Sequence, residues 1–106
     1  MELLIVGLLA LALQAAPGAR QFTGTISDSM CVNDHASMRM GPTDAECTRA
    51  CIDEHGATYV LYDGKDVYAL SDQRTPEKFA AQKVTVRGTV NVKTKTIQVD
   101  SITAAK

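Results

Sequence analysis

The three cysteines of this 106-residue chain all lie between residues 30 and 55, and this segment most constrains the fold. Both histidines and three of the four methionines lie in the same quarter of the sequence. A chain of this length forms one domain and buries only about 60–65% of its unfolded surface. Small domains often compensate for such a limited core with a disulfide or a bound metal. The rest of the chain must therefore form a scaffold that holds this segment.

The N-terminal residues have the pattern of an export signal. Residues 3–13 form an apolar run that ends in small residues and Pro17-Gly18. The run is shorter than the about 20 residues that a membrane span requires. We predict a signal peptide over residues 1–19, followed by an exported domain over residues 20–106, periplasmic or extracellular, with no membrane span after signal removal.

The charge balance and the aromatic content exclude one class of partner. Lys and Arg number 11 against 12 Asp and Glu, and the formal net charge is −1. Nucleic-acid binding depends mainly on neutralising phosphates, and single-strand binding also uses aromatic stacking. With no Trp, three Tyr and two Phe, the sequence predicts that nucleic acid is not a partner.

Alternating apolar residues and turn signals predict five short strands. Each strand shows a period of two or a short apolar run, which is typical of half-buried or buried β-structure. The strands are expected at residues 22–28, 57–62, 66–70, 83–90 and 96–102. Asp63-Gly64-Lys65 indicates a tight hairpin between the second and third strands. Thr75 as N-cap and Pro76 at the first helical position indicate a short helix over residues 75–81.

The segment with the cysteines also contains a well-marked helix. Thr43 followed by Glu46 forms a capping box at its start, and Gly56 is the expected stop after its end. Cys47 and Cys51 lie four residues apart and therefore share one helical face. The opposite face is expected to be solvated and carries Thr48, Arg49 and Asp53.

The predicted order is strand, helix, strand, strand, short helix, strand, strand. Without the first helix, this is the order of a five-stranded OB-like barrel. We therefore predict a mainly β fold with helices, in which a cysteine-bearing helix is inserted between strands one and two.

Two stretches carry a resemblance to known families. The pattern Tyr-x-Leu-x-Asp-Gly-x-x-Val-Tyr-x-Leu at residues 59–70, with the strands at residues 84–90 and 97–102, is similar to exported bacterial OB-fold proteins. Residues 24–31, Gly-x-Ile-Ser-Asp-x-x-Cys, resemble a group of uncharacterised exported bacterial domains. The resemblance covers residues 22–102 and implies an exported OB-like barrel. It brings no catalytic residue with it.

The cysteine segment contains two ligand pairs of equal spacing, Cys31-x3-His35 and Cys47-x3-Cys51. Cys47 and Cys51 can converge on one ion, because residues four apart on a helix have Cβ atoms about 5–6 Å apart. His55 lies two turns beyond Cys47, about 12 Å along the helix axis, so it cannot bind the same ion as Cys47 and Cys51 without distorting the helix. Together the two pairs form a Cys3His set, which is a usual set for structural zinc.

Methionine near these ligands favours a different metal. Met30, Met38 and Met40 flank His35 in a polar loop, where methionine has no obvious packing role. The alternative is that Met38 and Met40 cap the open end of the barrel. Thioether, thiolate and imidazole ligands together suit Cu(I). We therefore predict a metal-binding module for zinc or copper, with Met38 and Met40 as auxiliary ligands.

An alternative use of the cysteines is a structural disulfide. Cys31 paired with Cys47 or Cys51 would close a ring of about 16–20 residues and stabilise the fold by about 3 kcal/mol in the chain-entropy model. One thiol would remain, and the domain would then be a disulfide-stabilised module that binds a small ligand or a protein.

A redox role for Cys47 and Cys51 is a weaker hypothesis, because their spacing is Cys-x3-Cys, whereas Cys-x-x-Cys is the usual redox spacing. No nucleophile elbow accompanies these residues, and the sequence does not indicate an enzyme.

Overall fold

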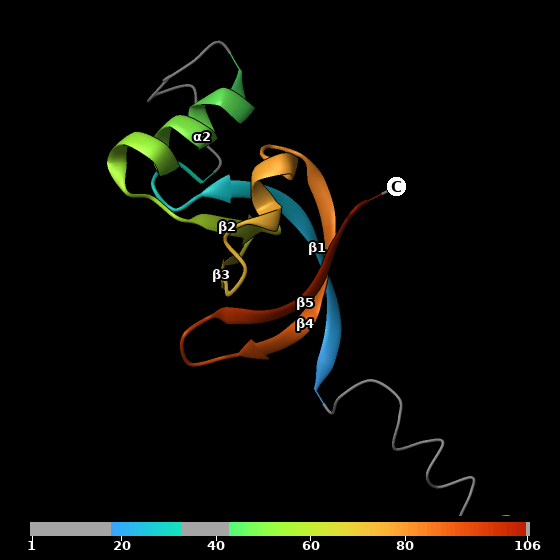
Figure 1. Cartoon of the computed structure of the whole chain (residues 1–106). Coiled ribbons are helices and arrows are strands. Elements are labelled where there is room, and N and C mark those ends of the chain that lie inside the picture. The colour runs from blue at the N-terminus through green and yellow to red at the C-terminus, as the bar shows by residue number, and fades with distance from the viewer. Residues whose placement is uncertain (1–17, 33–42, 106) are drawn as a thin grey trace, which may run out of the picture.

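A computed structural model of the chain describes residues 18–32 and 43–105. Its elements, in chain order, are β1 (Ala19–Asp28), α2 (Asp44–His55), β2 (Tyr59–Tyr62), β3 (Val67–Leu70), the 3-10 helix η1 (Thr75–Phe79), β4 (Lys83–Asn91) and β5 (Thr96–Ala104). The five strands form one closed barrel in the order β1-β2-β3-β5-β4 (Figure 1). This confirms the predicted mainly β, five-stranded barrel with the cysteine-bearing helix between its first two strands.

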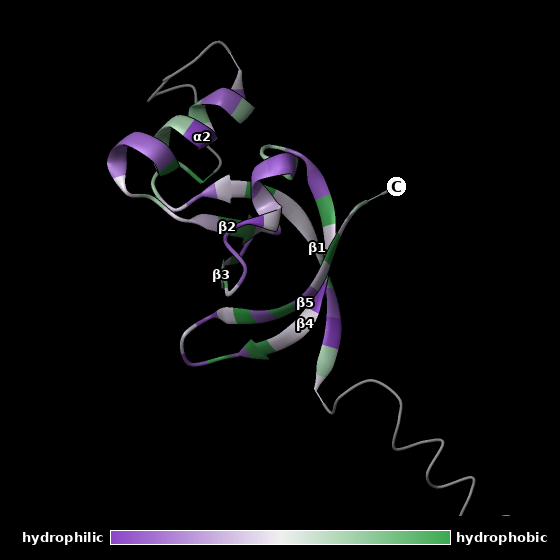
Figure 2. Ribbon diagram, viewed as in Figure 1, coloured by the Kyte–Doolittle hydropathy of each residue, from purple (hydrophilic) through white to green (hydrophobic). Residues whose placement is uncertain are grey.

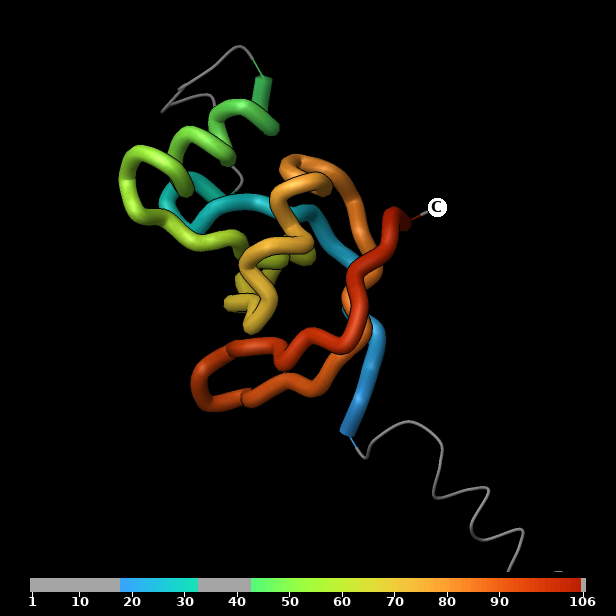
Figure 3. The backbone as a smooth tube through the Cα atoms, viewed as in Figure 1, coloured from blue at the N-terminus to red at the C-terminus, as the bar shows by residue number. Residues whose placement is uncertain are grey.

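Strand β1 is the element that joins the two sides of the barrel. Its first part pairs with β4, from Ala19 to Thr25, and its last part pairs with β2, from Thr25 to Asp28. The barrel closes through a short parallel pairing of β3 with β5. Strands β4 and β5 form a long curved hairpin, which is clear in the tube view of Figure 3. Because β1 ends against β2, the chain leaves the barrel there toward the cysteine segment.

The interior of the barrel is aliphatic. Ile26, Leu61, Val84, Val86 and Ile97 are all 0% exposed and belong to one core cluster. Those in β1, β4 and β5 lie at positions where the alternation predicts inward-facing residues. Leu61 belongs to β2, whose uninterrupted apolar run predicts burial on both faces, and Tyr59, Val60 and Leu61 are all buried.

Two glycines allow the strands to approach closely. A Cβ at Gly24 would lie 2.5 Å from the carbonyl oxygen of Tyr62, and one at Gly88 would clash with the carbonyl oxygen of Gln98. The pairing of β4 with β5 also shifts register at Arg87/Gly88. At both positions the barrel backbone leaves no room for a side chain.

Helix α2 lies beside the end of β1 (Figure 1). It begins as predicted, because the Thr43 side chain accepts a hydrogen bond from the Glu46 N–H at 3.1 Å. It ends at Gly56, whose φ of 71° is left-handed. Figure 2 shows long hydrophilic stretches in this helix, and its fully buried residues are Cys47, Thr48 and Cys51.

Two details of the helices differ from prediction. Thr48 was expected on the solvated face but is 0% exposed, because the buried arc of α2 is wider than the line of its two cysteines. The second helix is a 3-10 turn that ends at Phe79 rather than a helix to residue 81. Its start is held by the carboxylate of Asp72, which accepts the N–H groups of Arg74 and Thr75, rather than by Thr75 as N-cap.

The N-terminal prediction falls almost entirely outside the described residues. Of the predicted signal peptide only Gly18 and Ala19 are described, and Ala19 already pairs with Thr89 of β4. Export and signal cleavage therefore stay predictions. Among residues 18–32 and 43–105, no helix has the length and apolar character needed to cross a membrane.

Candidate metal centre

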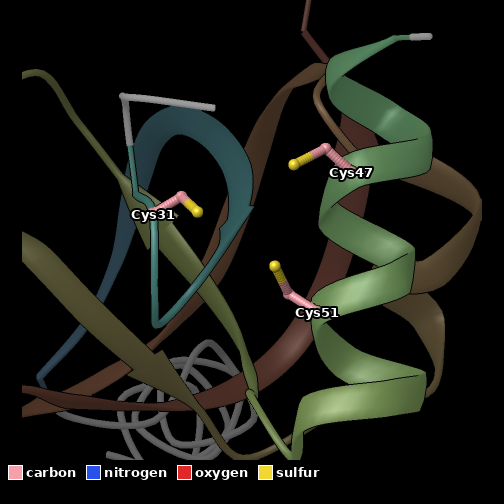
Figure 4. A group of neighbouring side chains, drawn as sticks. All are labelled: Cys31, Cys47 and Cys51. Carbon is pink, nitrogen blue, oxygen red and sulfur yellow. The ribbon is translucent and has the colours of Figure 1, made fainter. Parts of the chain in front are cut away.

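The sulfur atoms of Cys31, Cys47 and Cys51 gather at one place. All three lie within 4.8 Å of one another. Figure 4 shows Cys47 and Cys51 reaching from the same side of α2 toward Cys31, which lies on the turn after β1. Two segments that are 16 residues or more apart in the sequence thus contribute to one cluster of thiols, which we call the thiol cluster.

The helical part of the thiol cluster is positioned by the start of α2. The backbone N–H of Cys47 donates to the carbonyl of Thr43 at 2.9 Å, so the first turn of the helix is closed at this residue. Cys51 follows one turn later on the same side, and both side chains are 0% exposed. The predicted four-residue spacing therefore places two sulfurs on the buried face of α2.

The third thiol is positioned by a turn that follows β1. The side chain of Asp28 accepts hydrogen bonds from the backbone N–H groups of Met30 and Cys31, both at 2.9 Å. The carbonyl of Asp28 accepts the N–H of Val32 at 3.1 Å, and the hydroxyl of Ser27 donates to the carbonyl of Val32. Cys31 is consequently held in a compact turn at the end of the barrel strand.

The same turn is attached to the chain that enters β2. The N–H of Ser29 donates to the carbonyl of Thr58 at 2.9 Å, and the N–H of Thr58 donates to the hydroxyl oxygen of Ser29 at 3.0 Å. These two bonds continue the β1–β2 pairing past the last strand residues. The turn is therefore fixed relative to the barrel on one side and faces α2 on the other.

The surroundings of the thiol cluster favour the protonated form of Cys31 and Cys51 when no cation is bound. Burial, followed by the negative charge of Asp28, raises the pKa of Cys51 to about 12. Burial and then Asp28 also raise the pKa of Cys31, although hydrogen bonding to Cys51 acts in the opposite direction. Three thiolates at this place would need a positive ion to offset their desolvation.

The spacing of the sulfurs is close to that of a metal site. A tetrahedral zinc ion with Zn–S bonds of about 2.3 Å separates its sulfur ligands by about 3.8 Å. Since the three sulfurs already lie within 4.8 Å, each pair needs to close by no more than about 1 Å. The three cysteines can therefore hold one thiophilic ion with small side-chain movements.

The other predicted ligands, and the histidine that helix geometry excluded from the site, have different outcomes. His35, Met38 and Met40 lie outside the described residues, and their roles stay predictions. His55 is exposed in the last turn of α2 and lies outside the group of three convergent ligands.

One residue of this site was missed by the sequence reasoning. Asp28 was not among the predicted site residues, yet it is 0% exposed and lies beside the thiols. The spacing Asp-x-x-Cys, typical of an Asp side chain that accepts from a backbone N–H two or three residues later, was the signal that could have identified it.

The sulfurs of all three cysteines are thiols in this structure. Their separation nevertheless also suits the disulfide alternative, since Cys31 faces both helical cysteines across a short gap (Figure 4). The short distances between the sulfurs are therefore compatible with three metal-binding thiols and with one disulfide beside one thiol.

Comparison with known proteins identifies the family through the barrel rather than through the thiol cluster. A family model described as Protein of unknown function (DUF5818) matches residues 52–105. This range begins near the end of α2 and includes β2, β3, η1, β4 and β5, whereas all three cysteines precede it. Comparisons with curated proteins and with solved structures found no match. Because the family model covers half of the sequence, the chain belongs to the family described as Protein of unknown function (DUF5818).

Proposed function

We propose that this domain is a small exported metal-binding module for zinc or copper. Cys31, Cys47 and Cys51 supply thiolate ligands, and His35 completes the set as the fourth ligand. In a copper form, Met38 and Met40 assist as thioether ligands. The observation that supports this proposal most strongly is the approach of three sulfurs from two separate segments to within 4.8 Å of one another.

The packing of α2 gives the ion a physical role. The fully buried residues of this helix are two cysteines and a threonine, and its larger apolar residue Ile52 is only partly buried. An ion bound by Cys31, Cys47 and Cys51 would connect the helix to the turn after β1. Binding to the folded state alone stabilises that state, so metal affinity becomes folding free energy.

The raised pKa values favour a metal-binding role over a redox role. A reactive dithiol requires a depressed thiol pKa, which stabilises the attacking thiolate. Here burial raises the pKa of both Cys31 and Cys51. A divalent or soft monovalent cation can displace the thiol protons, whereas without metal a raised pKa makes Cys31 and Cys51 poor nucleophiles at neutral pH.

The test is metal titration of the reduced protein, monitored by native mass spectrometry. We expect one equivalent of zinc or Cu(I), and competition between the two identifies the preferred ion. Binding of less than about a tenth of an equivalent of either metal would overturn the proposal. A mass two hydrogens lower, with one alkylatable thiol, would instead identify the disulfide-stabilised binding module.

The identity of the fourth ligand can be tested by comparing alanine variants of the two histidines. His35→Ala should weaken zinc binding by at least about tenfold, since even outer-shell substitutions cost about 10–100-fold in affinity. His55→Ala should leave the affinity unchanged, because His55 is exposed at the end of α2. Equal losses in the two variants would contradict the assignment of His35.

A further inference from the structure

A buried carboxylate beside the thiol cluster remains unexplained by the proposed ligand set. Asp28 is 0% exposed and ends β1, immediately before the turn that carries Cys31. It does not belong to the group of three convergent ligands. We propose that Asp28 is a positioning residue, whose side-chain acceptor holds Cys31 where three thiolates, rather than two, reach the bound ion. This inference rests on the proposed metal-binding function.

The hydrogen bonds of Asp28 define the path of the chain at Cys31. One carboxylate oxygen, Oδ1, accepts the N–H groups of Met30 and Cys31, both at 2.9 Å. The carbonyl oxygen of the same residue accepts the N–H of Val32 at 3.1 Å. One residue thus holds three of the next four backbone amides, including that of the cysteine itself.

Asp28 can position Cys31 because Asp28 is itself fixed to the barrel. It is paired with Tyr59 at the end of the β1–β2 ladder. The next residue, Ser29, is tied to Thr58 by two hydrogen bonds. The position of Cys31 is therefore set by the barrel rather than by the helix that carries the other two cysteines.

The turn needs these acceptors because part of it is strained. Val32 has a φ of 55°, which is a left-handed conformation that a β-branched residue rarely adopts. The N–H and the carbonyl of Val32 are held by Asp28 and by Ser27, respectively. Without the side-chain acceptor of Asp28, we expect the turn to relax and Cys31 to move away from Cys47 and Cys51.

The experiment uses Co(II) as the metal probe with the reduced full-length protein. Sulfur-to-cobalt charge-transfer absorbance, measured per bound cobalt, reports how many thiolates bind the ion. Asp28→Ala should lower this absorbance to about two thirds of the wild-type value, the value expected also for Cys31→Ser. Its cobalt affinity should fall by about 10–100-fold.

A control variant is available elsewhere in the barrel. Asp63 forms the same kind of turn between β2 and β3, where its Oδ1 accepts the N–H groups of Lys65 at 2.9 Å and Asp66 at 2.6 Å. Asp63→Ala removes an equivalent set of bonds far from the thiols in the chain. It should leave the cobalt spectrum unchanged, so a general loss of stability is distinguished from a loss of positioning.

Two further variants separate geometry from charge and decide the question if Asp28→Ala does not fold. Asp28→Asn keeps an oxygen acceptor at the same reach without the charge, and it should retain the three-thiolate absorbance. Asp28→Glu keeps the charge but displaces the acceptor by a methylene, and it should show the two-thiolate absorbance.

The outcomes distinguish this inference from the proposed function. Wild-type protein without a sulfur-to-cobalt band would contradict metal binding by the cysteines. A wild-type band together with an undiminished band in Asp28→Ala or Asp28→Glu would overturn the positioning role alone. A two-thiolate band in Asp28→Asn would also overturn it.

Discussion

The barrel interior and the thiol corner, formed by the turn at residues 27–32 and by α2, are built from different side chains. The barrel encloses a continuous, mainly aliphatic cluster to which all five strands contribute. The thiol corner buries three polar residues, Ser27, Asp28 and Thr48, together with the sulfurs of Cys47 and Cys51. The barrel is stabilised by apolar burial and by the pairing of its strands, whereas the thiol corner depends on side-chain hydrogen bonds and, in our proposal, on an ion.

This difference indicates that the barrel supplies most of the folding stability, whereas the thiol corner carries the proposed metal-binding function. Apolar burial contributes roughly 25 cal/mol per Å² without requiring any ligand. Buried polar groups and thiols contribute little unless each is satisfied by a partner. We therefore expect the barrel to fold without metal, and the thiol corner to be the region whose order changes most when metal binds.

The largest effect should come from a cavity in the barrel. Leu61→Ala removes a side chain that is 0% exposed and should lower the free energy of unfolding by about 2–5 kcal/mol. Urea denaturation of the apo protein measures this change. Val92→Ala, at a side chain that is 77% exposed, is the control and should shift the free energy by less than about 0.5 kcal/mol.

Metal should stabilise the domain through the thiol corner. With free zinc at about 100 times its dissociation constant, the free energy of unfolding should rise by about 2.7 kcal/mol. Hydrogen exchange should show the increased protection mainly in α2. Cys51→Ser should lose most of the zinc increment, and an equal increment in this variant would contradict the proposed ligands.

Gly24 tests how tightly the barrel is closed. Gly24→Ala places a methyl group 2.5 Å from the carbonyl oxygen of Tyr62 and should destabilise the fold by about 1–3 kcal/mol. Thr23→Ala, at the exposed neighbouring position, should change stability by less than about 0.5 kcal/mol. If thermal unfolding shows no difference between these variants, the barrel backbone has more freedom there than we describe.

The stability of the apo protein should depend on pH through Cys51. Its folded-state pKa is raised from an ordinary value of 9.0 to about 12, so above pH 9 the unfolded chain loses this proton before the folded chain does. The corresponding stability is present below about pH 9 and is lost toward about pH 12, by at most about 1.4 kcal/mol per pH unit.

Chelator-treated, reduced wild-type protein and Cys51→Ser should therefore diverge in denaturation midpoint between about pH 8 and about pH 10.5. The serine variant lacks the Cys51 thiol and its interaction with Cys31, while tyrosine and lysine titrations are common to both proteins. Parallel pH profiles would show that Cys51 ionises as easily in the folded chain as in the unfolded chain.

The smallest effect should come from an exposed ion pair on the barrel surface. The Lys95 ammonium lies 2.5 Å from the Asp66 carboxylate, and the two side chains are 53% and 32% exposed. A double-mutant cycle with Lys95→Ala and Asp66→Ala should give a small coupling, well below the effect of Leu61→Ala, that decreases at high salt. A larger, salt-independent coupling would mean that this pair contributes to barrel closure.

The barrel was predictable because its signals are local. Alternation identifies inward residues such as Val84 and Val86, and glycines such as Gly88 mark the bends. The start of α2 was predictable for the same reason, since the side chain of Thr43 caps a helix regardless of what packs beside it.

The thiol corner was only partly predictable. The shared face of Cys47 and Cys51 follows from helical periodicity, but the approach of Cys31 depends on the path of the chain around β1. The burial of Thr48 and Asp28 depends on which surfaces meet after folding, and no local pattern contains that information. The sequence therefore predicted the shared face of the two helical cysteines better than the burial of the residues around them.

The most direct test of our proposal is zinc K-edge X-ray absorption of the reduced, zinc-loaded protein. We predict three sulfur neighbours at about 2.3 Å and one nitrogen neighbour at about 2.0–2.1 Å. A first coordination shell composed only of nitrogen and oxygen would contradict binding by the three cysteines.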